Sequence, residues 1–363
     1  MKLLLLFLII FSFEVLHATE FSRFCDRRLN RSSEYQSKYY HYTQNLLKTV
    51  DVNRIKNDYK VFFIAGYFGD TLMALNIPTR IVFGIGDYFK GHGEFLDHPN
   101  LQIDNMLIEV GTQDSPGKNA LFIKKAIEEN LPAHKKAFII AHSKGGIDAL
   151  DALVRYPQLQ RKVGALVTIQ TPFRGSPVAD ALYGANEDIK GPERLWNAFK
   201  RSVLSIVHAL TGGDIDSLNS LRSSVRKSYL VHHRTTIQRV LGIIPSLNIG
   251  TWLAREKNSS HFLFSFLEGF RNHMKDDLGL ESDGLVALPD STLNKVIDPI
   301  THRPEEGSPL WNANYVIFEG ADHASIALRS SSIDFDQYSF MKTILMMMLE
   351  ETDWREWANH HCY

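Results

Sequence analysis

Short apolar runs alternate with helical patterns along the middle of the chain. Five of these runs have the length and composition of buried strands: 61–65, 106–110, 137–141, 165–169 and 315–318. Apolar residues recur at helical spacing over 119–131, which predicts a helix. The run of methionines within 340–349 predicts a terminal amphipathic helix. A further apolar run at 262–267 predicts another strand. The alternation over 60–170 predicts an α/β fold, a mostly parallel sheet with helices on both faces.

The N-terminus has a different pattern. Lys2 is followed by an apolar run over 3–13 and by the small residue Ala18, which is typical of a signal peptide, here 1–18. The run is shorter than the ~20 residues of a membrane-spanning helix, and an uncleaved anchor is the alternative. Residues 19–59 are polar and predict an N-terminal extension with one helix, ahead of a domain over 60–363.

Residues 178–225 interrupt the alternation of strands and helices. They contain a helical stretch with a broad apolar face over 195–210, which ends at Gly212 and Gly213. An insert at this point of the architecture can form a movable helical lid over an apolar site. The alternative is an ordinary helix packed on the core. Further on, three prolines and several charges over 298–309 predict a loop.

Composition and charge exclude some classes of partner. The net charge is -1 at pH 7, so no bulk field favours nucleic acid or anionic lipid, and we expect no nucleic-acid partner. A hydrophobic content of 44% suits a globular protein with a full core. The two cysteines, Cys25 and Cys362, can form a disulfide in an oxidising compartment and fasten the ends of the mature chain. Two free thiols are the alternative.

The segment 137–146 carries the strongest chemical signal. Its apolar run ends in Ala-His-Ser-Lys-Gly, and a helical pattern follows at once. A strand, a sharp turn and a helix in this order present Ser143 above the sheet, where its hydroxyl can act as a nucleophile. Ala141 and Gly145 are small because strand and helix backbones approach closely there. A glycine-assisted turn with a solvated serine is the alternative.

A serine nucleophile needs a base and an acid that orients the base, and this architecture places them in the chain order Ser, acid, His. His323 directly follows the last predicted strand and is the expected base. Asp283, in a turn beside a glycine, is the expected acid, and Asp290 and Asp298 are weaker candidates. Asp322 is adjacent to His323, but neighbouring side chains rarely point at each other.

The oxyanion of an acyl-transfer intermediate needs hydrogen-bond donors that are in place before it forms. In this architecture one donor is the N–H after the nucleophile, which belongs to Lys144, and the other lies in a loop after an early strand. Gly66 and Tyr67 fit that loop, so we expect the Tyr67 N–H to be the second donor. A surface lysine and a core aromatic are the alternatives. The predicted chemistry uses no cofactor and no metal ion.

Together these segments resemble the secreted bacterial triacylglycerol lipases of the Pseudomonas and Burkholderia type, which have the α/β-hydrolase fold. The matching segments, in order, are 64–67, 141–146, 168–180, 282–286 and 321–323. Ala65 replaces the histidine of the family's oxyanion loop, and Ala141 replaces the first glycine around its serine. Ser325 stands where the family has a calcium-binding aspartate, so no calcium site is predicted.

The resemblance implies an exported serine carboxylic-ester hydrolase, periplasmic or extracellular, and in the first place a triacylglycerol lipase. Ser143, Asp283 and His323 would form its triad, and its substrate would be a lipid or ester at an oil–water or membrane interface. The alternative is another activity on the same triad: a phospholipase, a polyester depolymerase or an acyltransferase. The insert 178–225 would determine which of these substrates reaches Ser143. A non-catalytic lipid-binding protein of this fold is an alternative of another class. The sequence does not determine whether a folding chaperone is needed.

Overall fold

The computed structural model describes residues 32–44, 50–67, 85–111, 114–183, 216–254, 265–293, 314–330 and 335–361. Its elements, in chain order, are α2 (Ser32–Gln44), α3 (Val52–Asp58), β1 (Tyr59–Ile64), β2 (Ile85–Tyr88), α6 (Lys90–Asp97), β3 (Asn105–Ile108), α7 (Pro116–Asn130), β4 (Lys136–His142), α8 (Lys144–Arg155), α9 (Pro157–Gln160), β5 (Val163–Ile169), α10 (Pro177–Tyr183), α12 (Asp216–Asn219), α13 (Ser223–His232), α14 (Arg234–Ile243), β6 (Ser246–Trp252), α15 (Ser265–Leu278), the 3₁₀ turn η2 (Leu288–Ser291), β7 (Asn314–Glu319), β8 (Leu328–Ser330) and α16 (Gln337–His361).

Several predicted features lie outside the described residues. They are the signal peptide 1–18, Cys25 and Cys362, the helical stretch 195–210 of the insert, Asp298 and the loop 298–309. The described ends of the insert contain α10, α12 and the start of α13. Within the described residues, no helix combines the length and the apolarity needed to cross a membrane.

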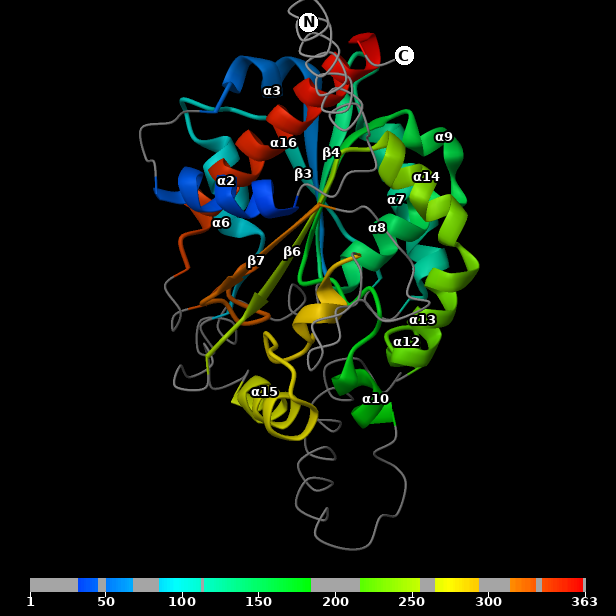
Figure 1. Cartoon of the computed structure of the whole chain (residues 1–363). Helices are drawn as coiled ribbons and strands as arrows, with labels where there is room; N and C mark the ends of the chain where they lie inside the picture. Colours follow the sequence, from blue (N-terminus) through cyan, green and yellow to red (C-terminus); the bar gives the residue numbers. More distant parts are fainter. Residues whose placement is uncertain are drawn as a thin grey trace, which may run out of the picture.

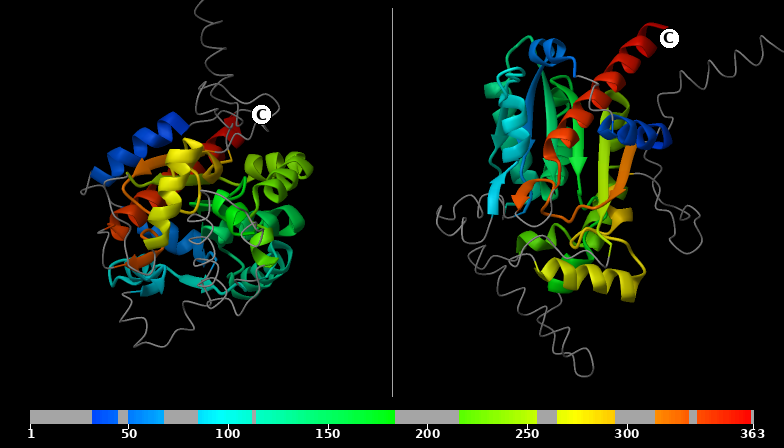
Figure 2. Two further views of the ribbon diagram at one scale, coloured as in Figure 1. Left: turned by 90° about the horizontal axis from the view of Figure 1, so that it is seen from below. Right: turned by 90° about the vertical axis from the view of Figure 1, so that its left-hand side faces the viewer.

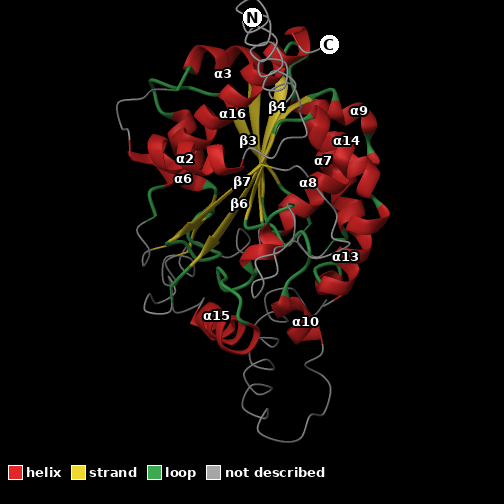
Figure 3. Ribbon diagram, in the orientation of Figure 1, coloured by secondary structure: helices red, strands yellow, loops and turns green. Residues whose placement is uncertain are grey.

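A parallel sheet of six strands, in the order β3-β1-β4-β5-β6-β7, forms the centre of the described part (Figure 3). Strands β2 and β8 form a separate antiparallel pair. Parallel strands need long crossover connections, and helices provide most of them here. Because all six strands run in one direction, their carboxyl ends meet at the same edge of the sheet, where this class of fold places its ligands.

Helices cover both faces of the sheet (Figure 1). Val61 and Phe63 of β1 belong to a buried cluster that includes side chains of α2 and α16. Phe62 and Ile64, which point the other way, belong to a second cluster with α7 and α8. The two further views in Figure 2 show the same layers from below and from the side. The predicted α/β architecture is therefore confirmed, and the apolar runs read as strands because both of their faces are buried.

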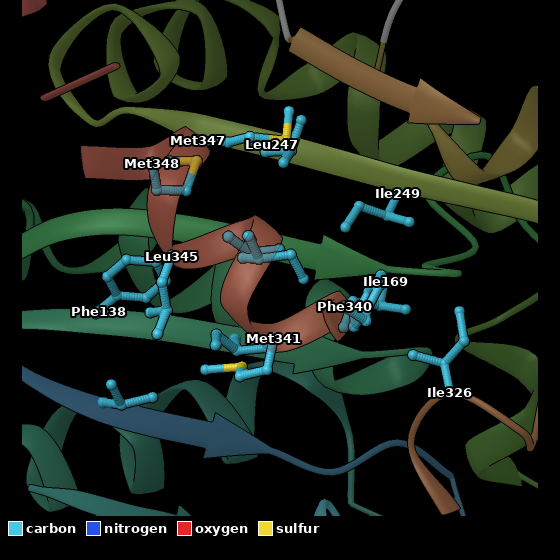
Figure 4. Packing of buried hydrophobic residues seen from close by; sticks show 14 of the residues in the cluster. Phe138, Ile169, Leu247, Ile249, Ile326, Phe340, Met341, Leu345, Met347 and Met348 are labelled. Carbon is cyan, nitrogen blue, oxygen red and sulfur yellow. The ribbon is translucent and has the colours of Figure 1, made fainter. Parts of the chain in front are cut away.

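Helix α16 supplies much of the core on its face of the sheet. Met341, Met347 and Met348 are buried, and Figure 4 shows them packed over sheet residues such as Leu247 and Ile249. Methionine is unbranched and flexible, so it fills irregular gaps between a long helix and a twisted sheet. The terminal helix predicted over 340–349 is present and extends to His361.

Part of the predicted N-terminal extension packs as part of the domain. The described part of this region, 32–44 and 50–59, contains two helices, α2 and α3, where the sequence predicted one. Tyr35, Tyr39 and Tyr42 of α2 are buried in the cluster that α16 contributes to, and the Tyr35 hydroxyl donates a hydrogen bond of 2.5 Å to Glu351 of α16. Aromatic rings bury much apolar surface, which explains how a polar segment joins the core.

The strand predicted over 262–267 is wrong, because residues 265–267 open helix α15, and 262–264 lie outside the described residues. The strand between β5 and β7 is β6, which the apolar pattern missed. Its buried polar side chains interrupt the apolar run but are hydrogen-bonded: Asn248 donates to Thr168 Oγ1 at 2.8 Å, and Thr251 donates to the Ala321 carbonyl at 3.0 Å. Satisfied polar groups can occupy a buried strand at little cost.

Candidate active site

Ser143 lies on the turn that joins β4 to α8, with φ 53° and ψ -128°. This backbone region is unfavourable for a residue with a side chain, and such strain persists where the surrounding structure enforces it. Here the Ser143 N–H donates to the Ile169 carbonyl of β5 at 2.8 Å, and helix α8 begins at the next residue. The strand–turn–helix arrangement predicted for Ser143 is present.

Close backbone approach around this turn requires glycine at two positions. A Cβ on Gly145 would lie 2.4 Å from the Ala65 carbonyl oxygen and 2.6 Å from that of Ile64. A Cβ on Gly66 would lie 2.6 Å from the Cβ of Ser143. Both separations are far below van der Waals contact, so the loop after β1 can pack against the serine turn only with glycine at these positions.

Three predicted site residues form one chain of hydrogen bonds. His323 Nε2 lies 2.8 Å from Ser143 Oγ, and His323 Nδ1 lies 2.9 Å from Asp283 Oδ2. Ser143 follows β4, His323 follows β7, and Asp283 lies between α15 and η2. The hydroxyl, the imidazole and the carboxylate thus stand in the order that proton transfer away from a serine nucleophile requires.

Both oxygens of the Asp283 carboxylate form hydrogen bonds. Its Oδ1 accepts hydrogen bonds from the N–H groups of Leu285 at 2.9 Å and Val286 at 2.8 Å, which leaves Oδ2 for His323. The backbone N–H of His323 also donates to the backbone carbonyl of Asp283 at 2.9 Å, so the two loops are joined through both backbone and side-chain hydrogen bonds. Gly284, with φ 104°, makes the turn that aims the two N–H groups at the carboxylate.

The other candidate acids have hydrogen-bond partners of their own. Asp322 Oδ1 accepts from the N–H groups of Ala324 at 3.0 Å and Ser325 at 2.8 Å, which is the local turn typical of aspartate. Asp290 lies in η2, where its carbonyl accepts from the Arg174 N–H. Asp283 is the candidate acid that is hydrogen-bonded to the His323 ring, at 2.9 Å.

The hydrogen-bonded chain is largely shielded from solvent. Ser143 and His323 are each 7% exposed and Asp283 is 2% exposed. A low local dielectric strengthens the interaction between a carboxylate and an imidazolium that forms beside it. The site therefore suits a reaction in which positive charge develops on His323 while Ser143 loses its proton.

The two expected oxyanion donors come from segments that flank Ser143. Lys144 is the first residue of α8, and the N–H groups of a first turn have no partner within their helix, so they favour negative charge. Tyr67 directly follows Gly66, whose backbone lies against the Ser143 side chain. The structure thus places both segments beside the nucleophile, which is the placement that the expected donor roles require.

The side chain of Lys144 is buried, unlike the surface lysine considered as an alternative. Its Nζ lies 2.9 Å from Asp148 Oδ2, and both side chains are almost fully enclosed. Asn119 of α7 also donates to Asp148 at 2.8 Å. Burial raises the pKa of Asp148, and Lys144 partly opposes this shift. The ion pair joins the first two turns of α8, directly behind the nucleophile.

Three buried polar residues around the site were given no role from the sequence: Tyr88, His142 and Gln170. Tyr88 Oη lies 2.5 Å from His142 Nδ1, and His142 Nε2 lies 2.9 Å from Gln170 Oε1. His142 and Gln170 each stand at the end of a predicted strand, which is a usable signal because functional side chains gather there. Tyr88 is brought in by β2, and no sequence pattern pointed to it.

The described residues contain no group of three or more His, Cys, Asp and Glu side chains arranged to hold a metal ion. Ser325, at the position of the family's calcium-binding aspartate, is instead engaged in the loop of His323. Its hydroxyl donates to the Asp322 carbonyl at 3.1 Å.

No protein-family model matches the sequence, and no curated protein matches it. Among solved structures, a metagenomic carboxyl esterase is similar over 83% of this chain and 76% of its own, with 18% identity and a TM-score of 0.52. A mature lipase of Bacillus licheniformis shares 17% identity over 82% of this chain and 92% of its own, with a TM-score of 0.48. A soluble variant of a monoglyceride lipase from Saccharomyces cerevisiae shares 13% identity over 83% and 87%, with a TM-score of 0.41.

The similarity to the metagenomic esterase concerns the fold, because so little of the sequence is shared. The parallel sheet, with helices on both faces and a strained serine turn after β4, agrees with this similarity. Together these features define the class of fold. The chain has the α/β-hydrolase fold.

Proposed function

We propose that the protein is a serine carboxylic-ester hydrolase. The observation that carries this proposal is the chain from Ser143 Oγ through His323 to Asp283, with bonds of 2.8 and 2.9 Å. Hydroxyl, imidazole and carboxylate in this arrangement are the groups needed for nucleophilic acyl transfer, and the arrangement is recognised by its geometry rather than by its position in a sequence. The α/β-hydrolase fold supports this reading.

In the proposed mechanism Ser143 Oγ bonds to the ester carbonyl carbon while its proton moves to His323 Nε2. The electron pair of the carbonyl double bond moves to the oxygen, where the N–H groups of Lys144 and Tyr67 stabilise the negative charge. Asp283 holds His323 in the tautomer that can accept at Nε2 and stabilises the imidazolium. The carbon–oxygen bond to the alcohol then breaks, and the leaving oxygen takes the proton from His323. Water attacks the acyl-enzyme in the same way, releases the acid and restores Ser143.

The surroundings of the proposed nucleophile favour an apolar acyl group. Tyr67, Ile147 and Leu285 belong to one hydrophobic cluster with residues of α10, α12 and α15. Tyr67 follows the oxyanion loop, Ile147 lies in the first turns of α8, and Leu285 stands two positions after Asp283. We therefore propose lipids or apolar esters as the substrate class, and a triacylglycerol lipase as the particular activity.

A fluorophosphonate probe tests the nucleophile. We expect the wild-type protein to be labelled and Ser143→Ala to be unlabelled, because the probe forms a covalent bond only with an activated serine. Ser220, a serine of the loop after α12, provides a matched control, and Ser220→Ala should be labelled like the wild type. Labelling that persists in Ser143→Ala would overturn the assignment, and tight lipid binding without any ester turnover would favour a non-catalytic protein.

The substrate is tested by comparing a soluble short-chain ester, emulsified triacylglycerol and a phospholipid. A lipase should hydrolyse the emulsion faster than the soluble ester, and its rate should rise when the substrate exceeds its solubility. Preference for the phospholipid, or transfer of the acyl group to an added alcohol, would instead support the alternatives on the same triad.

We further propose that the protein is exported and that residues 1–18 are removed. The basic start, the apolar run and Ala18 support this proposal. Sequencing the N-terminus of exported material should give Thr19 as the first residue, and material that begins at Met1 would contradict cleavage. The same preparation, digested without reduction, would show whether Cys25 and Cys362 are joined.

A further inference from the structure

A buried chain of polar side chains connects the oxyanion loop to the loop of His323. We propose that Tyr88, His142 and Gln170 are positioning residues, which hold Gly66-Tyr67 and His323 in register with Ser143. This inference rests on the proposed function and adds to it a set of residues that act through Gly66 and His323, whose ring lies 4.8 Å from that of His142 between centroids.

The hydrogen bonds of this chain can run in only one direction. The Gly66 N–H must donate, so Tyr88 Oη accepts it at 3.0 Å and donates its own proton to His142 Nδ1 at 2.5 Å. His142 then carries its proton on Nε2 and donates to Gln170 Oε1 at 2.9 Å. The Asp322 carbonyl can only accept, so it takes the Gln170 amide nitrogen and leaves Oε1 to accept from His142, which sets the tautomer of His142.

The far end of the chain has the same polarity. The Gln170 amide nitrogen donates to the Asp322 carbonyl at 2.9 Å and to Thr251 Oγ1 at 2.5 Å. A carbonyl can only accept, and the Thr251 hydroxyl donates its own hydrogen bond to the Ala321 carbonyl at 3.0 Å. Donors and acceptors therefore match from Gly66 to the residues immediately before His323.

Burial makes this network costly to disturb. Tyr88 is 5% exposed, His142 is 2% exposed and Gln170 is fully buried. Burial raises the pKa of Tyr88, and burial together with the neighbouring His323 lowers the pKa of His142, so both side chains stay neutral as the network requires. A donor or acceptor that lost its partner here would have no water to replace it.

The network acts at two points that matter for the proposed reaction. Gly66 is packed against Ser143 so closely that a single added Cβ would overlap it, and the next N–H is the expected oxyanion donor. At the other end, the Asp322 carbonyl belongs to the peptide that leads directly into His323. A displacement of about 1 Å at a reacting group can cost about 100-fold in rate. Loss of this hydrogen-bond network should therefore lower kcat more than it weakens substrate binding.

The test uses Tyr88→Phe and Gln170→Met, which keep side-chain size and remove the hydrogen bonds. The control is Tyr35→Phe, which removes a buried tyrosine hydroxyl that makes a bond of the same 2.5 Å length to Glu351, between helices α2 and α16. With a soluble ester we expect kcat to fall about 10-fold or more in each test variant with little change in KM, since removal of a whole oxyanion donor costs about 100- to 1,000-fold. The rate of fluorophosphonate labelling should fall in parallel, and Tyr35→Phe should leave both rates unchanged at a similar melting temperature.

The double variant Tyr88→Phe/Gln170→Met separates a connected chain from two unrelated defects. If both residues act through His142, the double variant should lose about as much kcat as the worse single variant, because coupled sites are not additive. Three results would overturn the positioning role in a protein whose Ser143 is still labelled. They are single variants with wild-type kcat, single variants that change only KM, and a double variant whose loss of kcat is the product of the two single losses. A wild-type protein that is neither labelled nor active would overturn the proposed function, and the positioning role with it.

Discussion

His323 Nε2 and Ser143 Oγ lie 2.8 Å apart although the two residues are separated by 180 positions in the chain. They meet because β4 and β7 are parallel strands of one sheet, so the loops after their carboxyl ends lie at the same edge.

Asp283→Asn should lower kcat by about 10,000-fold with the fold intact, as expected for loss of the triad acid. An asparagine that keeps its oxygen toward the two backbone N–H groups would present its NH₂ to His323 Nδ1. The imidazole would then carry its proton on Nε2 and could not accept the proton of Ser143. Asp322→Asn is the matched control, because its Oδ1 still accepts from the backbone. Equal losses in both variants would contradict the assignment of the acid.

Gly145→Ala should destabilise the protein by about 1–3 kcal/mol and abolish labelling of Ser143. The added Cβ would meet the Ala65 carbonyl oxygen at 2.4 Å, and backbone cannot move aside as a flexible side chain can. Gly242→Ala, in helix α14, is the control. No atom of the described residues lies within 4 Å of its added Cβ, so this variant should be neutral or stabilising by up to about 1 kcal/mol. Urea denaturation of both variants measures the difference.

Lys144→Met should destabilise the protein by about 3 kcal/mol or more, because it leaves the buried Asp148 carboxylate without its closest cation. The double variant Lys144→Met/Asp148→Leu should recover much of this loss, since replacing a whole buried pair with apolar residues is often neutral. Denaturation of the three proteins gives the comparison. A double variant that is no more stable than Lys144→Met would show that the unpaired Asp148 carboxylate is not the cause of the loss.

Stability should fall as the pH is lowered from 7 to 5, in part because of His92. This ring is enclosed by Phe63, Phe89 and Phe340, and among the described residues neither of its nitrogens has a hydrogen-bond partner. Burial lowers its pKa from 6.5 to about 3. Below pH 6.5 the unfolded chain therefore binds a proton that the folded chain does not, and the folded state loses about 1.4 kcal/mol per pH unit until the folded pKa is reached.

His92→Phe should remove this contribution. The loss of unfolding free energy between pH 7 and pH 5 should shrink by about 2 kcal/mol relative to the wild type. His98→Phe, at an exposed position, is the control, because this variant keeps the buried His92 and should keep its contribution. An unchanged pH dependence in His92→Phe would show that the ring is hydrated or protonated in the folded protein.

The sequence was a good guide where one local signal dominates. Strands β1, β4 and β5 are buried on both faces, so continuous apolar runs identified them. The turn of Ser143 was predictable because small residues must stand where strand and helix meet. Strand β6 was missed because its buried polar groups satisfy one another across strands, and pairing between strands leaves no mark on the apolar pattern of either one.

What the sequence determined by itself was the kind of fold and the order of the candidate groups, Ser143, then Asp283, then His323. Both follow from local rules, since burial sets the apolar runs and strand ends collect polar residues. The tertiary structure decided which carboxylate faces His323, that Lys144 points into the protein, and that Tyr88 reaches Gly66 and His142. These facts depend on distances between segments far apart in the chain, and such distances exist only once the sheet has brought its strand ends together.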